Sequence, residues 1–190
     1  MITKAINAFL FLVLISTHFA AAQILPPKIR GYKLYDAKVS ITNATDSAPQ
    51  NGGSDAYVRI LDPKITSIGL SGASVEISAE FTAMNQSGSV EFMTCRDLRV
   101  NGISIDVEEY AHPFTFKEDK PSTLPTPAKI SIKTSNLAKG AYKELVESKT
   151  DWAVTGTVFV FGKFKKFGFH FKRVVPVKID LTIKNPLKKT

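Results

Sequence analysis

Few residues in this chain have the types and spacing that catalysis or metal binding requires. Beyond residue 22 there are two histidines, His112 and His170, which are too few for a three-histidine zinc site. They also lack the spacing of a His-x-x-x-His pair, and no serine-nucleophile, phosphate-loop or dinucleotide-binding motif accompanies them. We therefore predict that the protein is not an enzyme and holds no cofactor.

Two further groups of residues have both a chemical and a structural interpretation. Cys95 is the only cysteine, so no intrachain disulfide can form. Its β-rich surroundings predict a small buried residue, and the alternatives are a reactive thiol or an intermolecular bridge. Asp106, Glu108 and Glu109 form the densest acidic group, and such carboxylates suit calcium. We expect these acids to mark a solvated strand end, and we predict no metal site.

The strongest candidate for a binding function is a basic, aromatic segment late in the chain. Residues 159–173 read FVFGKFKKFGFHFKR, with six phenylalanines and five lysines or arginines. Residues 159–190 carry nine basic side chains and one acidic side chain, a net charge of +8, which equals the net charge of the whole chain. Such an asymmetry is typical of contact with a polyanion or a membrane surface, and the alternative is a solvated strand face.

The elements that position these residues are predicted to be β-strands. Residues 75–83 alternate apolar and polar side chains, which is typical of a strand buried on one face. Asn101-Gly102 joins two further apolar runs and favours a two-residue hairpin. More strands are expected near 110–116, 129–133 and 152–161, and one short amphipathic helix is expected near 136–147.

In the closing segment the alternation assigns the rings and most of the cations to opposite faces. Phe167, Phe169 and Phe171 share their parity with the apolar residues of 177–183, so we expect these rings to lie on the core. Gly162 and the cations after it are the predicted connection of the hairpin, with one exposed ring at its tip. The candidate contact with an anionic surface consists of Lys163, Phe164, Lys165, Lys166 and Lys172. Because the other rings face the core, we predict no nucleic-acid binding.

The first residues of the chain are typical of a secretory signal peptide. Lys4 precedes an apolar stretch, and Ala20-Ala21-Ala22 supplies the small residues of a cleavage site. We therefore expect residues 1–22 to be removed and the protein to be periplasmic or extracellular. The alternative is an uncleaved segment that anchors the protein in a membrane. Residues 23–56 are predicted to be a partly extended, partly looped N-terminal extension, and residues 188–190 a basic tail.

The order of these signals resembles a known family. The segments ILDPKI, AMNQSG, LRVNGISID, DWAVTGTV and FGKFKKFGFHFKRVVPVKIDLTIKNPL are together similar to the late embryogenesis abundant group 2 family, which contains the water stress and hypersensitive response (WHy) domain. The resemblance covers residues 57–187. It implies an all-β, immunoglobulin-like or fibronectin-III-like β-sandwich and a protective role under water stress, and it brings no catalytic residues.

Two functions are expected for such a protein. The first is an exported, non-enzymatic β-sandwich that protects client proteins or envelope components during water stress or desiccation. The alternative is a lipid-binding or lipid-handling module, in which part of the apolar interior opens to receive a chain. This module would contact anionic membrane surfaces through the basic hairpin.

Overall fold

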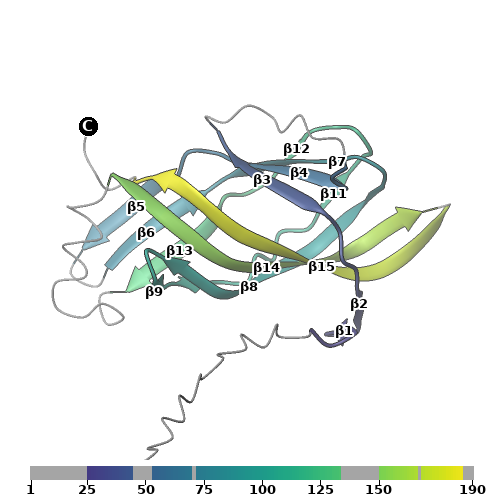
Figure 1. Ribbon diagram of the computed structural model, residues 1–190, viewed down its shortest axis with the longest axis horizontal. Helices are drawn as coiled ribbons and strands as arrows, with labels where there is room; N and C mark the ends of the chain where they lie inside the picture. The colour runs from purple at the N-terminus through teal and green to yellow at the C-terminus, as the bar shows by residue number, and fades with distance from the viewer. Residues whose placement is uncertain (1–24, 45–52, 70–71, 134–149, 167, 186–190) are drawn as a thin grey trace, which may run out of the picture.

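The protein is an all-β sandwich, as the sequence predicts (Figure 1). The computed structural model describes residues 25–44, 53–69, 72–133, 150–166 and 168–185. Within these ranges the regular secondary structure consists of β-strands, without a helix. The helix expected near 136–147, the signal peptide and the basic tail lie outside the described residues. The described part of the chain contains no helix that could span a membrane.

One layer of the sandwich is a large sheet built around three long strands. Its order is β1-β2-β15-β14-β8-β11, and β9 pairs with β8 outside this path. β14 and β15 pair along their whole length, from Asp151 with Lys184 to Lys166 with Phe169. The strands of this sheet are β1 (Lys28–Ile29), β2 (Tyr32–Leu34), β8 (Ser87–Val100), β9 (Ile103–Ser104), β11 (Phe114–Phe116), β14 (Asp151–Lys166) and β15 (Phe169–Lys184).

The other layer consists of two four-stranded sheets with the orders β10-β13-β6-β5 and β12-β7-β4-β3 (Figure 1). β3 pairs in parallel with β4 and also contacts β15, so this part of the N-terminal segment belongs to the sandwich. The strands of the two sheets are β3 (Val39–Asn43), β4 (Ala56–Ile60), β5 (Lys64–Gly69), β6 (Gly72–Ile77), β7 (Ala79–Ala83), β10 (Asp106–Val107), β12 (Ser122–Thr123) and β13 (Ala128–Lys133).

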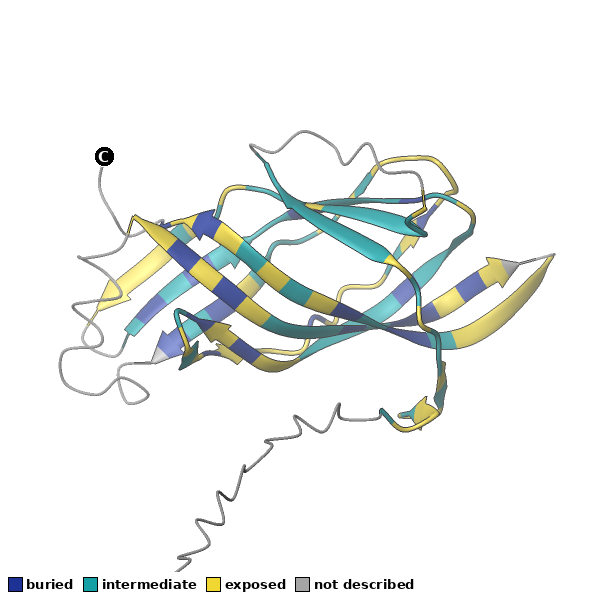
Figure 2. Ribbon diagram, in the orientation of Figure 1, coloured by how far each residue is buried: buried dark blue, intermediate teal, exposed yellow. Residues whose placement is uncertain are grey.

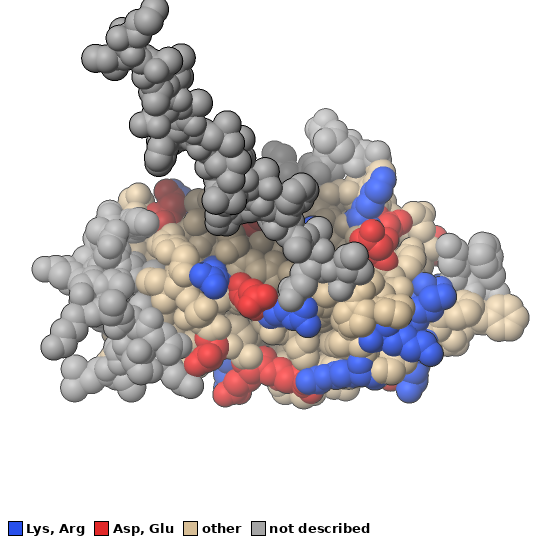
Figure 3. Space-filling model, turned by 60° about the horizontal axis from the view of Figure 1, so that its bottom comes forward, with Lys and Arg blue, Asp and Glu red and all other residues tan. Residues whose placement is uncertain are grey.

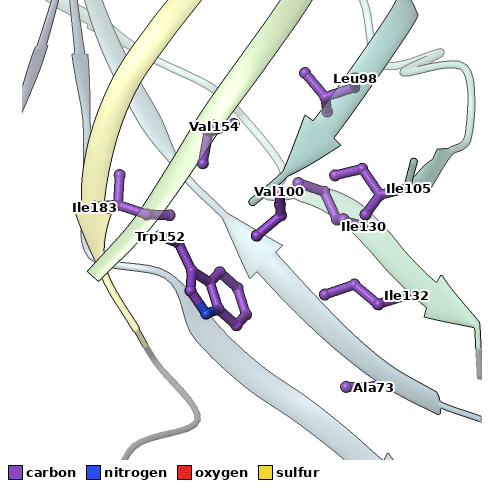
Figure 4. Packing of buried hydrophobic residues seen from close by; sticks show 9 residues of the cluster. All are labelled: Ala73, Leu98, Val100, Ile105, Ile130, Ile132, Trp152, Val154 and Ile183. Carbon is purple, nitrogen blue, oxygen red and sulfur yellow. The ribbon is translucent and has the colours of Figure 1, made fainter. Parts of the chain in front are cut away.

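Buried apolar residues form clusters on both faces of the large sheet. Between the layers, one cluster surrounds Trp152 and packs on β6 and β13 (Figure 4). A second cluster, around Val175 and Phe116, packs on β7. A third cluster lies on the outer face and centres on Phe161 and Val174. Buried and exposed residues alternate in bands along β14 and β15 because successive side chains of a strand point to opposite faces (Figure 2).

The predicted two-residue hairpin is confirmed. Val100 pairs with Ile103, and Asn101 and Gly102 between them have φ angles of 50° and 81°. These positive values are what a two-residue turn with the twist of the flanking strands requires. The hairpin therefore holds the end of β8 in place beside β9.

β8 contains a bulge that the sequence pattern does not indicate. Phe161 pairs with Phe92, but the next residue, Gly162, pairs with Val90. Glu91 is the extra residue of β8, and it reverses the faces to which the side chains on its two sides point. Phe92 therefore packs on the outer face, while Val90 packs between the layers. A side chain at Gly162 would approach the carbonyl oxygen of Ser89 to 2.2 Å, which explains the glycine at this position.

Candidate functional site: an apolar cavity between the layers

A large apolar cavity lies between the two layers of the sandwich. Its volume is about 530 Å³, and its walls come from both layers. β8, β14 and β15 supply one wall, and β3, β4, β7 and β13 supply most of the other. Protein interiors are normally packed as densely as organic crystals, with few voids larger than a water molecule. An opening of this volume therefore requires a specific explanation.

The cavity exists because many inward-facing residues are small. On β4 these residues are Ala56 and Val58, and in the middle of β14 they are Val158 and Val160. Stacked sheets lie about 10 Å apart, and alanine and valine side chains on both walls do not fill that distance. Val158 and Val160 consequently stay only half-buried although they pack towards the core between the layers.

Aromatic rings line one end of the cavity. Phe81 and Phe116 lie 5.3 Å apart between ring centroids, and Phe116 and Phe164 lie 5.9 Å apart. Phe114 joins them, at 5.4 Å from Phe81. All four rings belong to the cavity wall. The small residues thus occupy the middle of the sandwich, while the large aromatic side chains pack near the end where β14 and β15 are joined.

The cavity comes closest to solvent along one edge of the sandwich. The exposed members of its wall are Glu108, Glu109, His112 and Lys129, which lie around β10 and β13. These side chains bring both signs of charge and an imidazole to an otherwise apolar site. A ligand with an apolar body and one polar end would match this distribution, because polar groups at a pocket usually fix the orientation of the ligand.

Tyr110 connects the two layers at this edge through hydrogen bonds. Its backbone exchanges two hydrogen bonds with Met93 of β8, at 2.9 and 3.0 Å. Its hydroxyl donates to the carbonyl oxygen of Thr126 at 2.8 Å and accepts from the Thr126 N–H at 3.3 Å. Burial raises the pKa of Tyr110 above its ordinary value, so the hydroxyl keeps its proton at neutral pH. Tyr110 therefore links the large sheet to the segment before β13.

Cys95 lines the cavity and is not an activated nucleophile. Burial raises the pKa of its thiol to about 11, because desolvation disfavours the thiolate. At neutral pH the side chain is thus protonated and acts as a small apolar group. Catalytic cysteines have the opposite property, a lowered pKa caused by neighbouring positive charge.

The described histidines and acids are not gathered at one place. The described residues contain no group of three histidine, cysteine or acidic side chains that could hold an ion. His112 lies against Tyr110, with ring centroids 5.2 Å apart, and His170 is exposed on β15. Glu109 forms an ion pair with Arg30, and Glu108 is exposed at the end of β10.

The predicted basic residues are arranged around a single acid on the outer face of the large sheet. Lys163 Nζ lies 2.9 Å from Oε1 of Glu91, and Tyr32 donates a hydrogen bond to the same carboxylate. Lys172 pairs with Lys163 across the strands, and its Nζ lies 5.6 Å from the centre of the Tyr32 ring. The hydrogen bond from Tyr32 and the contact with Lys163 lower the pKa of Glu91. Two of the predicted cations therefore lie together.

The other predicted residues lie closer to the turn. Lys165 is exposed and pairs with His170, and Lys166 pairs with Phe169. Phe167, which the alternation predicts to lie on the core with Phe169 and Phe171, lies outside the described residues, and Gly168 beside it has a φ of 82°. The prediction of a connection beginning at Gly162 is therefore wrong: β14 continues to Lys166, because the ladder with β15 runs without interruption up to the turn.

Two predictions about the rings are also wrong. Phe164 is buried, with 6% of its surface exposed, because it packs on Phe116 instead of standing at a tip. Phe169 and Phe171 are exposed, at 69% and 41%. Phe171 pairs with the buried Phe164, so it extends from a strand position beside the core. Its side chain nevertheless remains exposed, because the ribbon reaches beyond the opposite layer (Figure 2).

Comparison with known proteins gives loose likenesses only. A crystal structure of a protein from Archaeoglobus fulgidus matches with a TM-score of 0.36 and 13% identity, over 66% of this chain and 95% of that chain. The solution structure of a proposed late embryogenesis abundant (LEA) protein matches with a TM-score of 0.26 and 9% identity, over 68% of this chain and 72% of that chain. No family model and no curated protein matches the sequence. At these scores no function is transferred, and the cavity is the feature from which a function can be argued.

Proposed function

We propose that this protein binds an amphipathic lipid and holds its apolar chain between the two layers of the sandwich. The observation that carries the proposal is the cavity of about 530 Å³. Sites for small molecules are typically apolar, of about 300–1,000 Å³, with a few polar groups that orient the ligand. Glu108, His112 and Lys129 would supply such groups at the exposed edge.

The energetics of an empty cavity support an occupant. Unfilled volume in an apolar core costs stability because the atoms that line it lose contacts with neighbours. An apolar cavity also does not gain by filling with water, since water needs polar partners there. An acyl chain would restore the missing contacts without requiring hydrogen bonds from the walls. The ligand would thus act as part of the core.

The proposed function is binding and not catalysis. The protonated thiol of Cys95 lines the cavity as a small apolar group, which suits a storage or carrier role. Protection under water stress, which the sequence resemblance implies, stays a prediction, as does export through the N-terminal segment. Neither of them conflicts with a bound lipid.

A variant that fills the cavity tests the proposal. Native mass spectrometry of the purified protein should detect bound lipid, and the delipidated protein should take up a fluorescent fatty-acid analogue. Val158→Phe places a ring in the cavity and should weaken uptake about tenfold or more, a loss of 1.4 kcal/mol or above. Ala153→Phe adds the same ring at an exposed position of β14 and should bind like the wild type.

The result that contradicts the proposal is equally clear. Repeated preparations without lipid, combined with no uptake of the analogue by delipidated protein, would remove lipid binding. Equal uptake by Val158→Phe and the wild type would show that the analogue binds outside the cavity. Thermal unfolding of each variant serves as the control for an intact fold.

A further inference from the structure

The end of the β14–β15 ribbon is the most exposed apolar part of the described chain. Three large apolar side chains are strongly exposed among the described residues, and two of them, Phe169 and Phe171, lie at this end. The third, Ile68, is on β5. The ribbon extends past the two smaller sheets, so no layer covers the two rings (Figures 1 and 2). β2 pairs with β15 only at Arg173 and Val174, which leaves the first residues of β15 at the edge.

Cations flank these rings. Lys165 and Lys172 are exposed, and Lys165 pairs across the ribbon with His170. The guanidinium of Arg173 lies 5.3 Å from the centre of the Phe171 ring. Lysine and arginine side chains gather at this end of the molecule in the space-filling view (Figure 3). Isolated charges are ordinary on a solvated surface. Exposed aromatic rings that are grouped with several cations instead indicate an interaction site.

We infer that this ribbon end docks on an anionic lipid bilayer. The rings of Phe169 and Phe171 enter the interface, and Lys165 and Lys172 contact the phosphates of the headgroups. A strand rises about 3.3 Å per residue, so Phe169 at the tip lies about 10 Å beyond Lys172 along β15. Apolar groups of peripheral proteins enter the interface to a depth of about 5–10 Å. Lys172 is thus at the level of the headgroups when the Phe169 ring is immersed, and Lys165, which pairs with His170 one residue from the tip, extends its long side chain back to the headgroups.

A bilayer fits this arrangement better than a nucleic acid does. Successive side chains of a ribbon point to opposite faces, so Phe169 and Phe171 are on one face with Arg173 beside them, while His170 and Lys172 are on the other. A single strand of nucleic acid needs cations along the same groove in which its bases stack on rings. A bilayer surrounds an inserted tip and meets both faces at once. Positive charge of the ribbon complements the negative surface of the membrane.

Docking is independent of the proposed cavity ligand, but the two sites are neighbours. Phe164 pairs across the ribbon with Phe171, and it also lines the cavity. The tip therefore leads directly to the aromatic end of the cavity wall. A docked protein would have this end of the cavity next to the bilayer.

Vesicle flotation tests the inference with two double variants. Vesicles of phosphatidylcholine with phosphatidylserine should carry the wild type upward, and vesicles of phosphatidylcholine alone should carry much less. Phe169→Ser with Phe171→Ser should lower the bound fraction at least about tenfold, because the immersed apolar area is lost. Lys165→Glu with Lys172→Glu should lower it at least about tenfold as well and remove the dependence on salt.

Matched controls are available on β5. Ile68→Ser with Lys64→Glu removes one exposed apolar side chain and one exposed cation far from the ribbon, and it should float like the wild type. All of these positions are exposed, so the variants should keep the unfolding temperature of the wild type. Uptake of the fluorescent fatty acid should also be unchanged, which separates docking from filling of the cavity.

Three outcomes would overturn the inference. The wild type does not float with anionic vesicles; both ribbon variants float as well as the wild type; or a single-stranded oligonucleotide binds the ribbon and displaces the vesicles at low concentration. The last result would assign the same residues to nucleic-acid binding instead.

Discussion

The two faces of the large sheet are both apolar around the middle of β14 and β15, but they are packed in different ways. On the outer face, Phe92 and Phe161 stack at 4.4 Å between ring centroids, and Tyr32 of β2 packs edge-on against both. On the inner face, alanine and valine residues leave a cavity of about 530 Å³. The outer face is covered only by the short hairpin of β1 and β2, whereas the inner face is covered by the complete layer of the two four-stranded sheets. How completely the space on each face is filled therefore depends on the size of the side chains that face it, and not on how much of the face is covered by other strands.

The largest effect should come from the filled face. Phe161→Ala removes a ring that is 1% exposed and stacked on Phe92, and the neighbours cannot close the space. We expect the free energy of unfolding to fall by about 3–5 kcal/mol. Urea denaturation followed by tryptophan fluorescence gives the value, since Trp152 is buried. A loss below about 1 kcal/mol would show that the outer cluster is loosely packed too.

A matched pair of neighbouring residues compares the two faces directly. Val174 is fully buried on the outer face, and Val175 lines the cavity on the inner face. Each valine loses the same two methyl groups on mutation to alanine, but only at Val174 does a new void form in packed surroundings. In delipidated protein, Val174→Ala should therefore destabilise by about 1 kcal/mol more than Val175→Ala. Equal losses would mean that the cavity collapses around its walls.

The smallest effect concerns the ion pair between Glu91 and Lys163, which holds Tyr32 of β2 against the outer face. The pKa of Glu91 is lowered in the folded protein, mainly by the hydrogen bond from Tyr32 and by Lys163. The charged carboxylate therefore stabilises the fold above its unfolded-state pKa, and this stabilisation is lost as the pH falls through the lower folded-state pKa. Glu91→Gln should reduce stability by less than about 1 kcal/mol at pH 7, because the pair is partly exposed.

The pH profile separates this electrostatic effect from a loss of shape. The difference between the wild type and Glu91→Gln should be largest near neutral pH and should shrink in acid, where the carboxylate of the wild type is protonated. Denaturation midpoints between pH 2 and pH 7 measure it. A difference that stays constant over this range would assign the effect to packing.

The sequence alone was sufficient for the fold class and for local features. Asn101-Gly102 indicates the hairpin correctly, because this signal depends on neighbouring residues. Alternation at residues 75–83 correctly predicts extended chain, but the single strand expected there is divided at Ser78 into β6 and β7, which belong to different sheets. It was not sufficient for the burial of the ribbon rings. Phe164 and Phe171 have the same face but different cover, and cover depends on where the opposite layer ends.

The cavity could not be predicted for a related reason. Alanine and valine at inward positions, such as Ala56 and Val158, are visible in the sequence as small residues. Whether two small residues oppose each other depends on pairing between segments that are far apart. The bulge opposite Gly162 also reverses the faces of β8, which simple alternation misses. A run of small inward residues on several strands is a signal that deserves a search for a cavity in such folds.

The position of β14 in the large sheet has a consequence for synthesis. β14 lies between β8 and β15, and both β14 and β15 follow the other described strands in the chain. Until residues 151–166 have left the ribosome, β8 lacks its long partner β14 and exposes an edge that invites pairing with other chains. Productive folding therefore waits until the ribbon has been released from the ribosomal tunnel. A nascent chain that stalls before residue 151 should depend on chaperones to stay in solution.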